Sequence, residues 1–472
     1  MEINQINKTN ISILILSLLF IFSGSFFYPG TKTLYILFSI IIFAFIYYSF
    51  FISNFYFFNF FLSIYFFLGF WLKLFFVEFF FNGKYPEINS DIIKLNEYNY
   101  DLTITIISIS IFGFFLGSFI SKKININVFK SINILPFDLF YQKYRISIIL
   151  LFFVFIVGIY ITNFFYSIHQ KGIISEQNYF VTNLFKTFIV LLIPLIISVL
   201  AYHEIRLKKN LSYNFLFLIN FDLFLSSVST ISRAMFFNFL GIFFGIFIFL
   251  KKVNIKNFYF KIFSFTLIAI ILFLISFYIV NLSRDIKYKK KDFTSEVIIN
   301  NYSQSKENFK QVILKRFVGI DGILALTTLN NLSFKTFKKS LKEKFNQKDG
   351  TFRDKLFNEN YTDNQILNNQ SVYRIKTIGI VGFLYYSGSY FFVFFSSLLI
   401  GLFFCYFEKV IKKLFCDNLI FTSVISHIIV YRLIHFGYLP INSIKFFISI
   451  FLIIILFILF YKSYEKLNGK YF

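Results

Sequence analysis

The sequence predicts an all-α, polytopic membrane protein of about twelve transmembrane helices, with one large outer loop between the ninth and tenth. Hydrophobic residues make up 57% of the 472 residues and charged residues only 15%, and the mean hydropathy is +0.70. Apolar runs of about 18 residues or more, each long enough to cross about 30 Å of hydrocarbon, recur along the chain. A water-soluble core of this composition is excluded.

Hydropathy places the spans in order along the chain. The first span follows Lys8, is longer than the apolar core of a signal peptide and has no small-residue cleavage site after it, which favours a helix. Pro194 lies within the sixth span and is expected to kink it. The expected spans are residues 11–28, 33–52, 55–81, 102–121, 146–166, 181–202, 211–227, 234–250, 262–280, 380–406, 419–435 and 446–461.

These spans divide the chain into three parts. Residues 1–280 hold helices one to nine, residues 281–377 form the large outer loop, and residues 378–472 hold helices ten to twelve and a short cytoplasmic tail. With the N-terminus inside, the short inner loops carry 19 Lys and Arg residues and the short outer loops carry four. The positive-inside rule therefore predicts that both termini are cytoplasmic.

The outer loop is the most informative part of the sequence. It holds 19 of the 47 Lys and Arg residues against 10 acidic residues, in a chain that is otherwise almost entirely apolar runs. A cationic outer segment on a bilayer protein indicates an anionic, membrane-bound substrate. The halves of the chain show no repeat, which argues against a transporter built from inverted repeats.

Composition also bears on which residues carry chemistry. The 79 Phe residues accompany abundant Ile, Asn and Lys, which indicates an AT-rich genome. Codon drift among lipid-facing apolar residues therefore explains the Phe excess, and the Phe runs do not indicate a cofactor site. Against 39 Lys residues there are eight Arg residues, so an Arg marks a position that needs a planar, forked donor. The two Cys and four scattered His residues have no metal-ligand spacing, and we expect no metal and no cofactor.

Two candidate positions lie near the outer ends of helices seven to nine. Arg233 opens helix eight, and Asp222 in helix seven is close enough along the hairpin to pair with it. Arg284 follows helix nine, at the depth of a lipid diphosphate. The functional interpretation is that both arginines bind phosphate. The alternatives are a structural ion pair for Arg233 and an interfacial, snorkelling side chain for Arg284.

Two further candidates lie in the loop stretch Lys-Arg-Phe-Val-Gly-Ile-Asp-Gly. Its apolar spacing predicts a short helix packed against the membrane helices. In the functional interpretation Arg316 binds the substrate, and Asp321 is the base that takes a proton from a sugar hydroxyl. The alternative is an amphipathic helix that lies on the surface.

The entry into helix ten and the end of helix eleven supply the remaining candidates. Arg374 precedes a glycine-punctuated entry in which Tyr385 and Tyr386 offer rings and hydroxyls to a sugar, or else belong to an interfacial aromatic belt. Arg432 and His435 share a face of helix eleven and are expected to point into the bundle. His435 is a candidate acid or base, with a hydrogen-bonded structural histidine as the alternative.

With these residues in place, the chain resembles the O-antigen polymerases, the oligosaccharide repeat-unit polymerases of bacterial envelopes. The resemblance rests on the span layout, the late outer loop, the Ser-Arg that opens helix eight, and the motifs Arg-x-x-Gly-x-Asp-Gly and Gly-x-x-Gly-x-x-Tyr. These motifs carry over Arg233, Arg316 and Arg374, and less firmly Asp321. The resemblance implies the bacterial cytoplasmic (inner) membrane as the location.

The resemblance also implies a reaction and its partners. A glycan on undecaprenyl diphosphate is transferred as a block to the outermost sugar of a second lipid-linked repeat unit, and the polyprenyl diphosphate leaves. Arginines stabilise the leaving charge without a metal. The implied partners are the undecaprenyl-diphosphate-linked oligosaccharide, membrane lipids, a flippase and a chain-length regulator, and no nucleic acid.

Four other functions compete with this interpretation. An O-antigen ligase uses the same donor with a lipid A-core acceptor. A lipid-linked oligosaccharide flippase is expected to have short loops throughout. A polyprenyl-phosphate-dependent monosaccharide transferase needs acidic residues in the first outer loop, which here is Pro-Gly-Thr-Lys-Thr. A membrane O-acyltransferase needs an early catalytic histidine, but the first histidine of this chain is His169.

Overall fold

The structure is a computed structural model of the whole chain. It describes residues 17–52, 56–85, 88, 93–125, 131–170, 178–210, 212–232, 235–253, 258–289, 319–343, 352, 356, 378–437 and 440–468. Within these ranges the regular elements are helices and none is a strand, as the predicted all-α class requires.

Nine helices in the described ranges are long and apolar enough to cross a membrane. Three of the expected spans are present as shorter apolar helices, Ser17–Phe27, Tyr213–Ser229 and Leu419–Ile434. The chain therefore has the helices of a polytopic membrane protein, whereas the count of twelve spans stays a prediction. The ninth expected span extends further than its hydropathy indicated, since helix α11 (Phe258–Lys289) includes Arg284.

The chain forms two compact units, and neither follows the three topological parts of the sequence. Unit 1 comprises Met1–Asn125, Val312–Phe407 and Val430–Phe446, and unit 2 comprises Ile126–Gln311, Glu408–Ile429 and Phe447–Phe472. Helices α18 (Tyr390–Leu414), α19 (Leu419–Ile434) and α20 (Pro440–Asn468) contribute residues to both.

Unit 1 combines early membrane helices with short helices from the region of the outer loop. Its π-helical turns are η1 (Tyr48–Ile52) and η2 (Phe67–Leu72). Its remaining helices are α2 (Lys32–Tyr47), α3 (Phe57–Phe66), α4 (Lys73–Phe81), α5 (Glu97–Lys123), α13 (Ile320–Thr327), α14 (Phe334–Leu341) and α17 (Gly379–Tyr385). An Asn96–Asn99 capping box begins α5, where side-chain oxygens satisfy backbone N–H groups that the helix leaves open.

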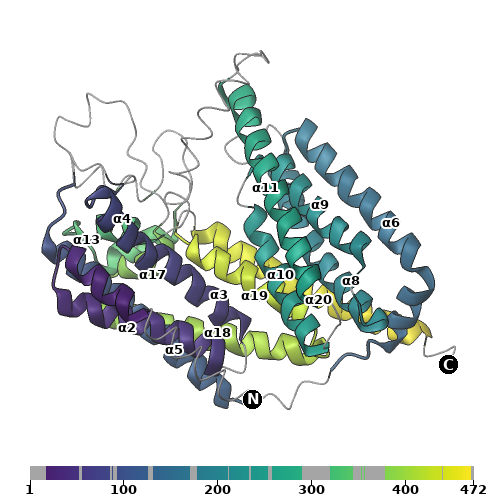
Figure 1. Cartoon of the computed structure of the whole chain (residues 1–472), viewed down its shortest axis with the longest axis horizontal. Coiled ribbons are helices and arrows are strands. Elements are labelled where there is room, and N and C mark those ends of the chain that lie inside the picture. Colours follow the sequence, from purple (N-terminus) through teal and green to yellow (C-terminus); the bar gives the residue numbers. More distant parts are fainter. Residues whose placement is uncertain are drawn as a thin grey trace. The chain divides into compact units, whose positions relative to one another are not determined.

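Unit 2 is a bundle of long apolar helices, in which α6, α9 and α11 run side by side (Figure 1). The π-helical turn η3 (Phe188–Leu192) ends just before Pro194, so the irregularity expected at this proline takes the form of a π-helical turn. Its helices are α6 (Leu135–Phe165), α7 (Tyr179–Thr187), α8 (Ile193–Lys208), α9 (Tyr213–Ser229), α10 (Met235–Val253) and α11.

Each unit contains a pair of glycines four residues apart that lets two helices approach closely. In α5, a Cβ atom on Gly113 or Gly117 would lie 2.6 Å from the Phe394 carbonyl or 2.2 Å from the Leu398 carbonyl of α18. In α10, a Cβ atom on Gly245 would lie 2.7 Å from a Cα atom of α19. Such small-residue spacing is typical of helix contacts in membranes, where close packing replaces the hydrophobic drive available in water.

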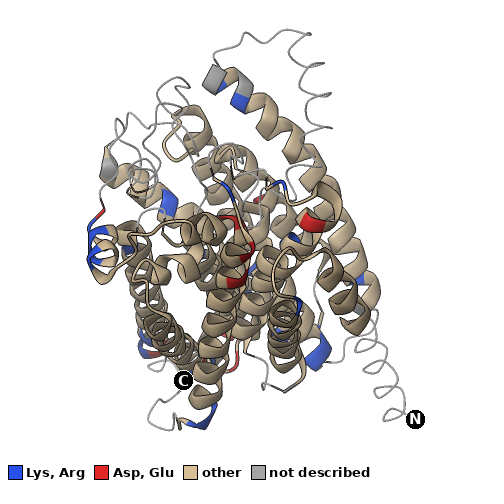
Figure 2. Ribbon diagram, turned by 90° about the vertical axis from the view of Figure 1, so that its left-hand side faces the viewer, with Lys and Arg blue, Asp and Glu red and all other residues tan. Residues whose placement is uncertain are grey.

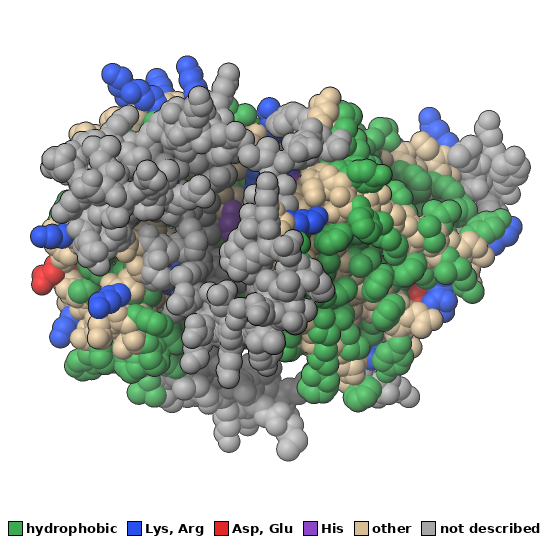
Figure 3. All heavy atoms as spheres, turned by 90° about the horizontal axis from the view of Figure 1, so that it is seen from above, with side chains coloured by type: hydrophobic (Ala, Val, Ile, Leu, Met, Phe, Trp, Pro, Cys, Tyr) green, Lys and Arg blue, Asp and Glu red, His purple; other side chains and the backbone are tan. Residues whose placement is uncertain are grey.

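The outer faces of the helices suit a lipid environment. Large side chains of α6 and α11 are exposed, such as Leu151 at 74% and Phe263 at 65%, and hydrophobic side chains cover much of the right-hand surface in Figure 3. Figure 2 shows Lys and Arg mostly near helix ends. Basic residues occupy the last turns of α5, α8, α10, α18 and α20, where they also complement the helix dipole.

Candidate functional site

The site in unit 1 is built on one continuous helical run, Phe57–Phe81. Its middle turn, η2, is π-helical, and such turns are often found at functional sites because they shift the residues that follow onto a new face. The Trp71 indole in this turn donates a hydrogen bond to the Ser39 hydroxyl of α2 at 2.8 Å. This bond fixes the turn, and Lys73 follows it directly at the start of α4.

Lys73 forms a buried ion pair with Asp321, the first-turn acid of α13. The Lys73 Nζ and Asp321 Oδ2 atoms are 2.7 Å apart, and each side chain is 2% exposed. The other carboxylate oxygen, Oδ1, accepts no hydrogen bond from the described residues. Removal of one partner from such a pair leaves an uncompensated buried charge, which costs about 3–5 kcal/mol.

Backbone packing beside the ion pair is equally close. A Cβ atom on Gly319 would lie 1.7 Å from the Gly69 carbonyl oxygen and 2.4 Å from its carbon. No side chain fits between these backbones, so Gly319 sets the depth at which α13 enters the helices of unit 1. Asp321 then lies opposite Lys73, one helical turn beyond Gly69.

The far end of α13 is anchored to α5. The Asn99 side-chain amide donates to the Thr327 carbonyl at 3.1 Å, and the Thr103 and Thr327 hydroxyls are 3.4 Å apart. Every residue of α13 is buried. The predicted short helix is therefore present, and it is an inserted helix and not an amphipathic helix lying on the surface.

Helix α17 packs against α13 and carries the candidate Tyr385, followed by Tyr386. The two rings are only 7% and 1% exposed, so neither presents an open face to solvent in this structure. The Tyr386 carbonyl accepts a hydrogen bond from the Ser333 amide at 3.0 Å, which holds the start of α14. Burial, with the nearby Tyr390 hydroxyl, raises the pKa of Tyr385 to about 12.

Arg432 and His435 lie at the end of α19, in the same unit. The Arg432 guanidinium lies 5.0 Å from the centre of the Phe446 ring. His435 Nδ1 is 2.9 Å from the Tyr431 carbonyl, which can only accept, so the lone pair of the neutral ring is on Nε2. Tyr431 in turn contacts the ring of Tyr65 in α3, with centroids 6.2 Å apart.

A ring contact joins the end of α19 to α17. The Phe383 and Phe436 centroids are 4.8 Å apart. The structure thus brings Asp321, Tyr385, Tyr386, Arg432 and His435 onto elements that are packed together within unit 1.

Among the other predicted arginines, only Arg284 lies within the described residues. Arg284 belongs to unit 2, where its guanidinium donates to the Ile231 carbonyl at 3.0 Å. This contact directs the Arg284 side chain to a backbone carbonyl within unit 2, and its expected role in phosphate binding stays a prediction. Arg233, Arg316 and Arg374 lie outside the described residues.

Asp222 has a partner that the sequence did not indicate. The Tyr160 hydroxyl of α6 donates to Asp222 Oδ1 at 2.6 Å, and both side chains are buried. This bond connects α6 to α9 in the interior of unit 2, where an unpaired carboxylate would be costly.

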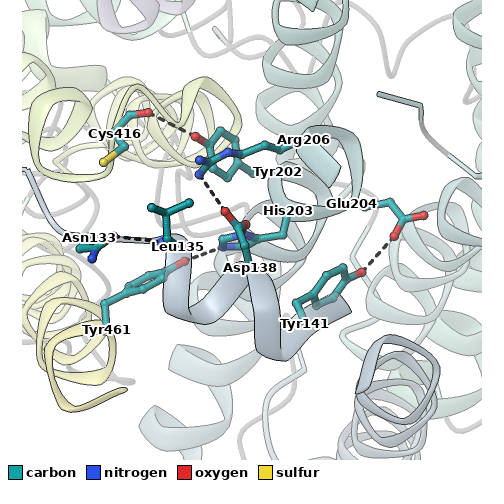
Figure 4. A network of polar contacts seen from close by, with 10 residues as sticks. All are labelled: Asn133, Leu135, Asp138, Tyr141, Tyr202, His203, Glu204, Arg206, Cys416 and Tyr461. Atoms are coloured by element: carbon teal, nitrogen blue, oxygen red, sulfur yellow. Dashed lines mark hydrogen bonds and ion pairs between the residues drawn. The ribbon is translucent and has the colours of Figure 1, made fainter. Parts of the chain in front are cut away.

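A second buried polar cluster joins α6, α8 and α20 in unit 2 (Figure 4). His203 is fully buried, with Nδ1 2.5 Å from Asp138 Oδ1 and Nε2 3.0 Å from the Tyr461 hydroxyl. Because an ionised carboxylate only accepts, Nδ1 carries a proton toward Asp138. Arg206 lies 3.0 Å from the other oxygen of Asp138.

A bidentate ion pair lies next to this cluster. Arg145 Nε and Nη2 donate to the two oxygens of the buried Glu204 at 2.7 and 2.6 Å, and the Tyr141 hydroxyl donates to the same carboxylate at 3.2 Å. Forked pairing of this kind is stronger and more directional than a lysine contact. The second cluster and this ion pair therefore hold the first three turns of α6 against the C-terminal half of α8.

Sequence reasoning missed Lys73. It also missed that His203 pairs with Asp138 and that Arg145 pairs with Glu204. Their signal was a charged residue within or beside an apolar span, since such residues need partners inside the protein. That signal names the residue that needs a partner but not the partner. Among the described residues no three His, Cys, Asp or Glu side chains lie together as a metal site would need.

Comparison with protein-family models, with curated proteins and with solved structures gives no match to this chain.

Proposed function

We propose that the protein is an oligosaccharide repeat-unit polymerase of the bacterial cytoplasmic membrane, with both termini in the cytoplasm. Its substrates are two undecaprenyl-diphosphate-linked repeat units, one the donor and the other the acceptor. The observation that carries the proposal is the burial of α13 against the membrane helices, where Asp321 pairs with Lys73. This contact couples a lysine-rich segment suited to diphosphate with helices suited to a polyprenyl chain.

Two predicted phosphate-binding arginines are adjacent in sequence to the inserted helices. Arg316 precedes Gly319 by three residues, and Arg374 precedes Ile378 by four. The described helices that follow these arginines in sequence, α13 and α17, contact each other within unit 1. In this proposal the guanidinium groups bind the donor diphosphate and stabilise it as it leaves.

The transfer step assigns different roles to His435 and Asp321. The acceptor hydroxyl oxygen bonds to the donor anomeric carbon, the bond from that carbon to the diphosphate oxygen breaks, and the hydroxyl proton passes to His435 Nε2. The fixed Nδ1 contact of His435 supports this role, since it leaves the basic lone pair on Nε2. Asp321, 2% exposed and paired with Lys73, acts as a positioning residue and not as the expected base.

The test uses a strain from which the gene has been deleted, complemented with single variants, and reads surface glycan length on gels. The expected result is a ladder of polymer with the wild-type chain and with the control Lys338→Arg, since Lys338 is exposed on α14. Arg316→Lys and Arg374→Lys should leave single repeat units at the surface without a ladder. A ladder in the uncomplemented strain would falsify the proposal, and transfer to lipid A-core without polymer would instead identify a ligase.

A further inference from the structure

Unit 2 contains a large apolar groove that the proposed function does not use. It has a volume of about 620 Å³ and lies between α6, α8 and α20. Its walls include Phe140, Tyr144 and Leu151 from α6, Ile196 from α8, and Leu456 and Phe460 from α20. A volume of this size is within the range of small-molecule binding sites.

Irregular helix geometry at two walls of the groove produces the space. Tyr144, which lines it, has non-helical angles (φ −112°, ψ 20°) that kink α6. On the opposite side Leu192 ends the π-helical turn η3, and Pro194 is the second residue of α8, which follows directly. The groove therefore lies where the backbones of both helices depart from regular α-helical geometry.

The groove is somewhat shorter than one leaflet of a bilayer. Lining residues on α20 run from Ile453 to Phe460, and those on η3 and α8 from Leu192 to Leu200. At about 1.5 Å per residue, these runs correspond to about 10–12 Å. Half of a hydrocarbon core is about 15 Å. An acyl chain from the same leaflet can occupy the groove with part of its length, whereas most of a long polyisoprenoid would lie outside it.

Polar and basic groups gather at one end of the groove. The Tyr464 ring is 5.2 Å from that of Phe140, and the exposed Lys143 ammonium lies 5.3 Å from the Tyr144 ring centre. Tyrosines and lysines at the end of an apolar groove are the usual surroundings of an anionic lipid headgroup.

We propose that this groove binds one acyl chain of an anionic glycerophospholipid, with the headgroup phosphate held by Lys143. The neighbouring cluster of Asp138, His203 and Tyr461 holds the wall of the site in place, since Phe137 both lines the groove and contacts the His203 ring at 4.7 Å. This site is independent of the proposed glycosyl transfer.

The test is native mass spectrometry of the full chain, purified in detergent and incubated with phosphatidylglycerol, phosphatidylcholine or polyprenyl phosphate. The expected result is one retained phosphatidylglycerol per chain. Ser147→Trp and Leu151→Trp, which fill the groove from the lipid side, should abolish this retention. The matched control is Val154→Trp on the same helix, because Val154 is 69% exposed and does not line the groove.

The headgroup is tested separately with the variant Lys143→Glu. It should bind phosphatidylglycerol roughly tenfold more weakly than the wild-type chain does, since each lysine near an anionic surface contributes on the order of 1 kcal/mol. Lys251→Glu, at the end of α10, is the control. Three results would each overturn the proposal. They are wild-type retention of phosphatidylglycerol in both groove-filling variants, binding of phosphatidylcholine equal to that of phosphatidylglycerol, and a preference for polyprenyl phosphate.

Discussion

Lys73 and Asp321 form a buried ion pair in which a membrane-spanning helix supplies the cation and a short inserted helix supplies the acid, with their charged atoms 2.7 Å apart. Neither side chain has an alternative route to water, since each is 2% exposed. The pair therefore ties the position of α13 to the membrane helices, and its loss has measurable consequences.

Neutralisation of one partner should destabilise the protein strongly. We expect Lys73→Met to cost about 3–5 kcal/mol, because it leaves the Asp321 carboxylate buried without a cation. The measurement is the apparent Tm of the purified chain in detergent. Lys73→Met combined with Asp321→Leu removes both charges and should recover most of the loss, whereas a wild-type Tm for Lys73→Met alone would show that the pair contributes no stability.

Gly319→Ala should disrupt both stability and polymer formation. Its Cβ atom would lie 1.7 Å from the Gly69 carbonyl oxygen, so the backbones must separate, at a cost on the order of 1–3 kcal/mol. The matched control is Gly158→Ala in α6, where a Cβ atom meets nothing within 4 Å and alanine is the better helix former. The control should be neutral or stabilising, and similar behaviour of the two variants contradicts the inserted position of α13.

Tyr160→Phe tests the contact between α6 and α9. It removes the 2.6 Å hydrogen bond to the buried Asp222, and we expect a loss of about 1–3 kcal/mol because the acceptor is left unsatisfied. Thermal unfolding in detergent measures this loss. Tyr166→Phe is the control, since Tyr166 is 67% exposed, and an equal effect of both substitutions would argue against the buried bond.

Tyr385 gives a pH dependence with a defined sign. Its pKa is raised to about 12 by burial, whereas a tyrosine in the unfolded chain has a pKa of about 10. The unfolded state therefore loses its proton first, and the stability from Tyr385 is complete below pH 10 and is lost as the pH rises toward 12. Tyr385→Phe should reduce the fall in Tm between pH 10 and 12 relative to the wild-type chain, and parallel curves would contradict the burial of this hydroxyl.

Sequence patterns were sufficient for the helical class and for most helix positions, because hydropathy is a local property. The run Phe57–Phe81 and the helix that contains Pro194 lie close to their expected ranges. The short helix at Asp321 also follows from apolar spacing. The end of α11 was placed too early, because a helix continues past the apolar run when polar residues such as Lys287 find partners, here the Phe164 carbonyl at 2.9 Å.

What the sequence by itself determined is which charged residues must have partners, since the cost of a charge in an apolar span is a property of that residue alone. The tertiary structure decided which partner each one has: Lys73 for Asp321, Tyr160 for Asp222, and Arg145 for Glu204. These pairings depend on how helices distant in sequence pack, which in this chain is set by close backbone contacts such as that of Gly319 with Gly69. No local pattern encodes such contacts, because their energy exists only when both helices are in place.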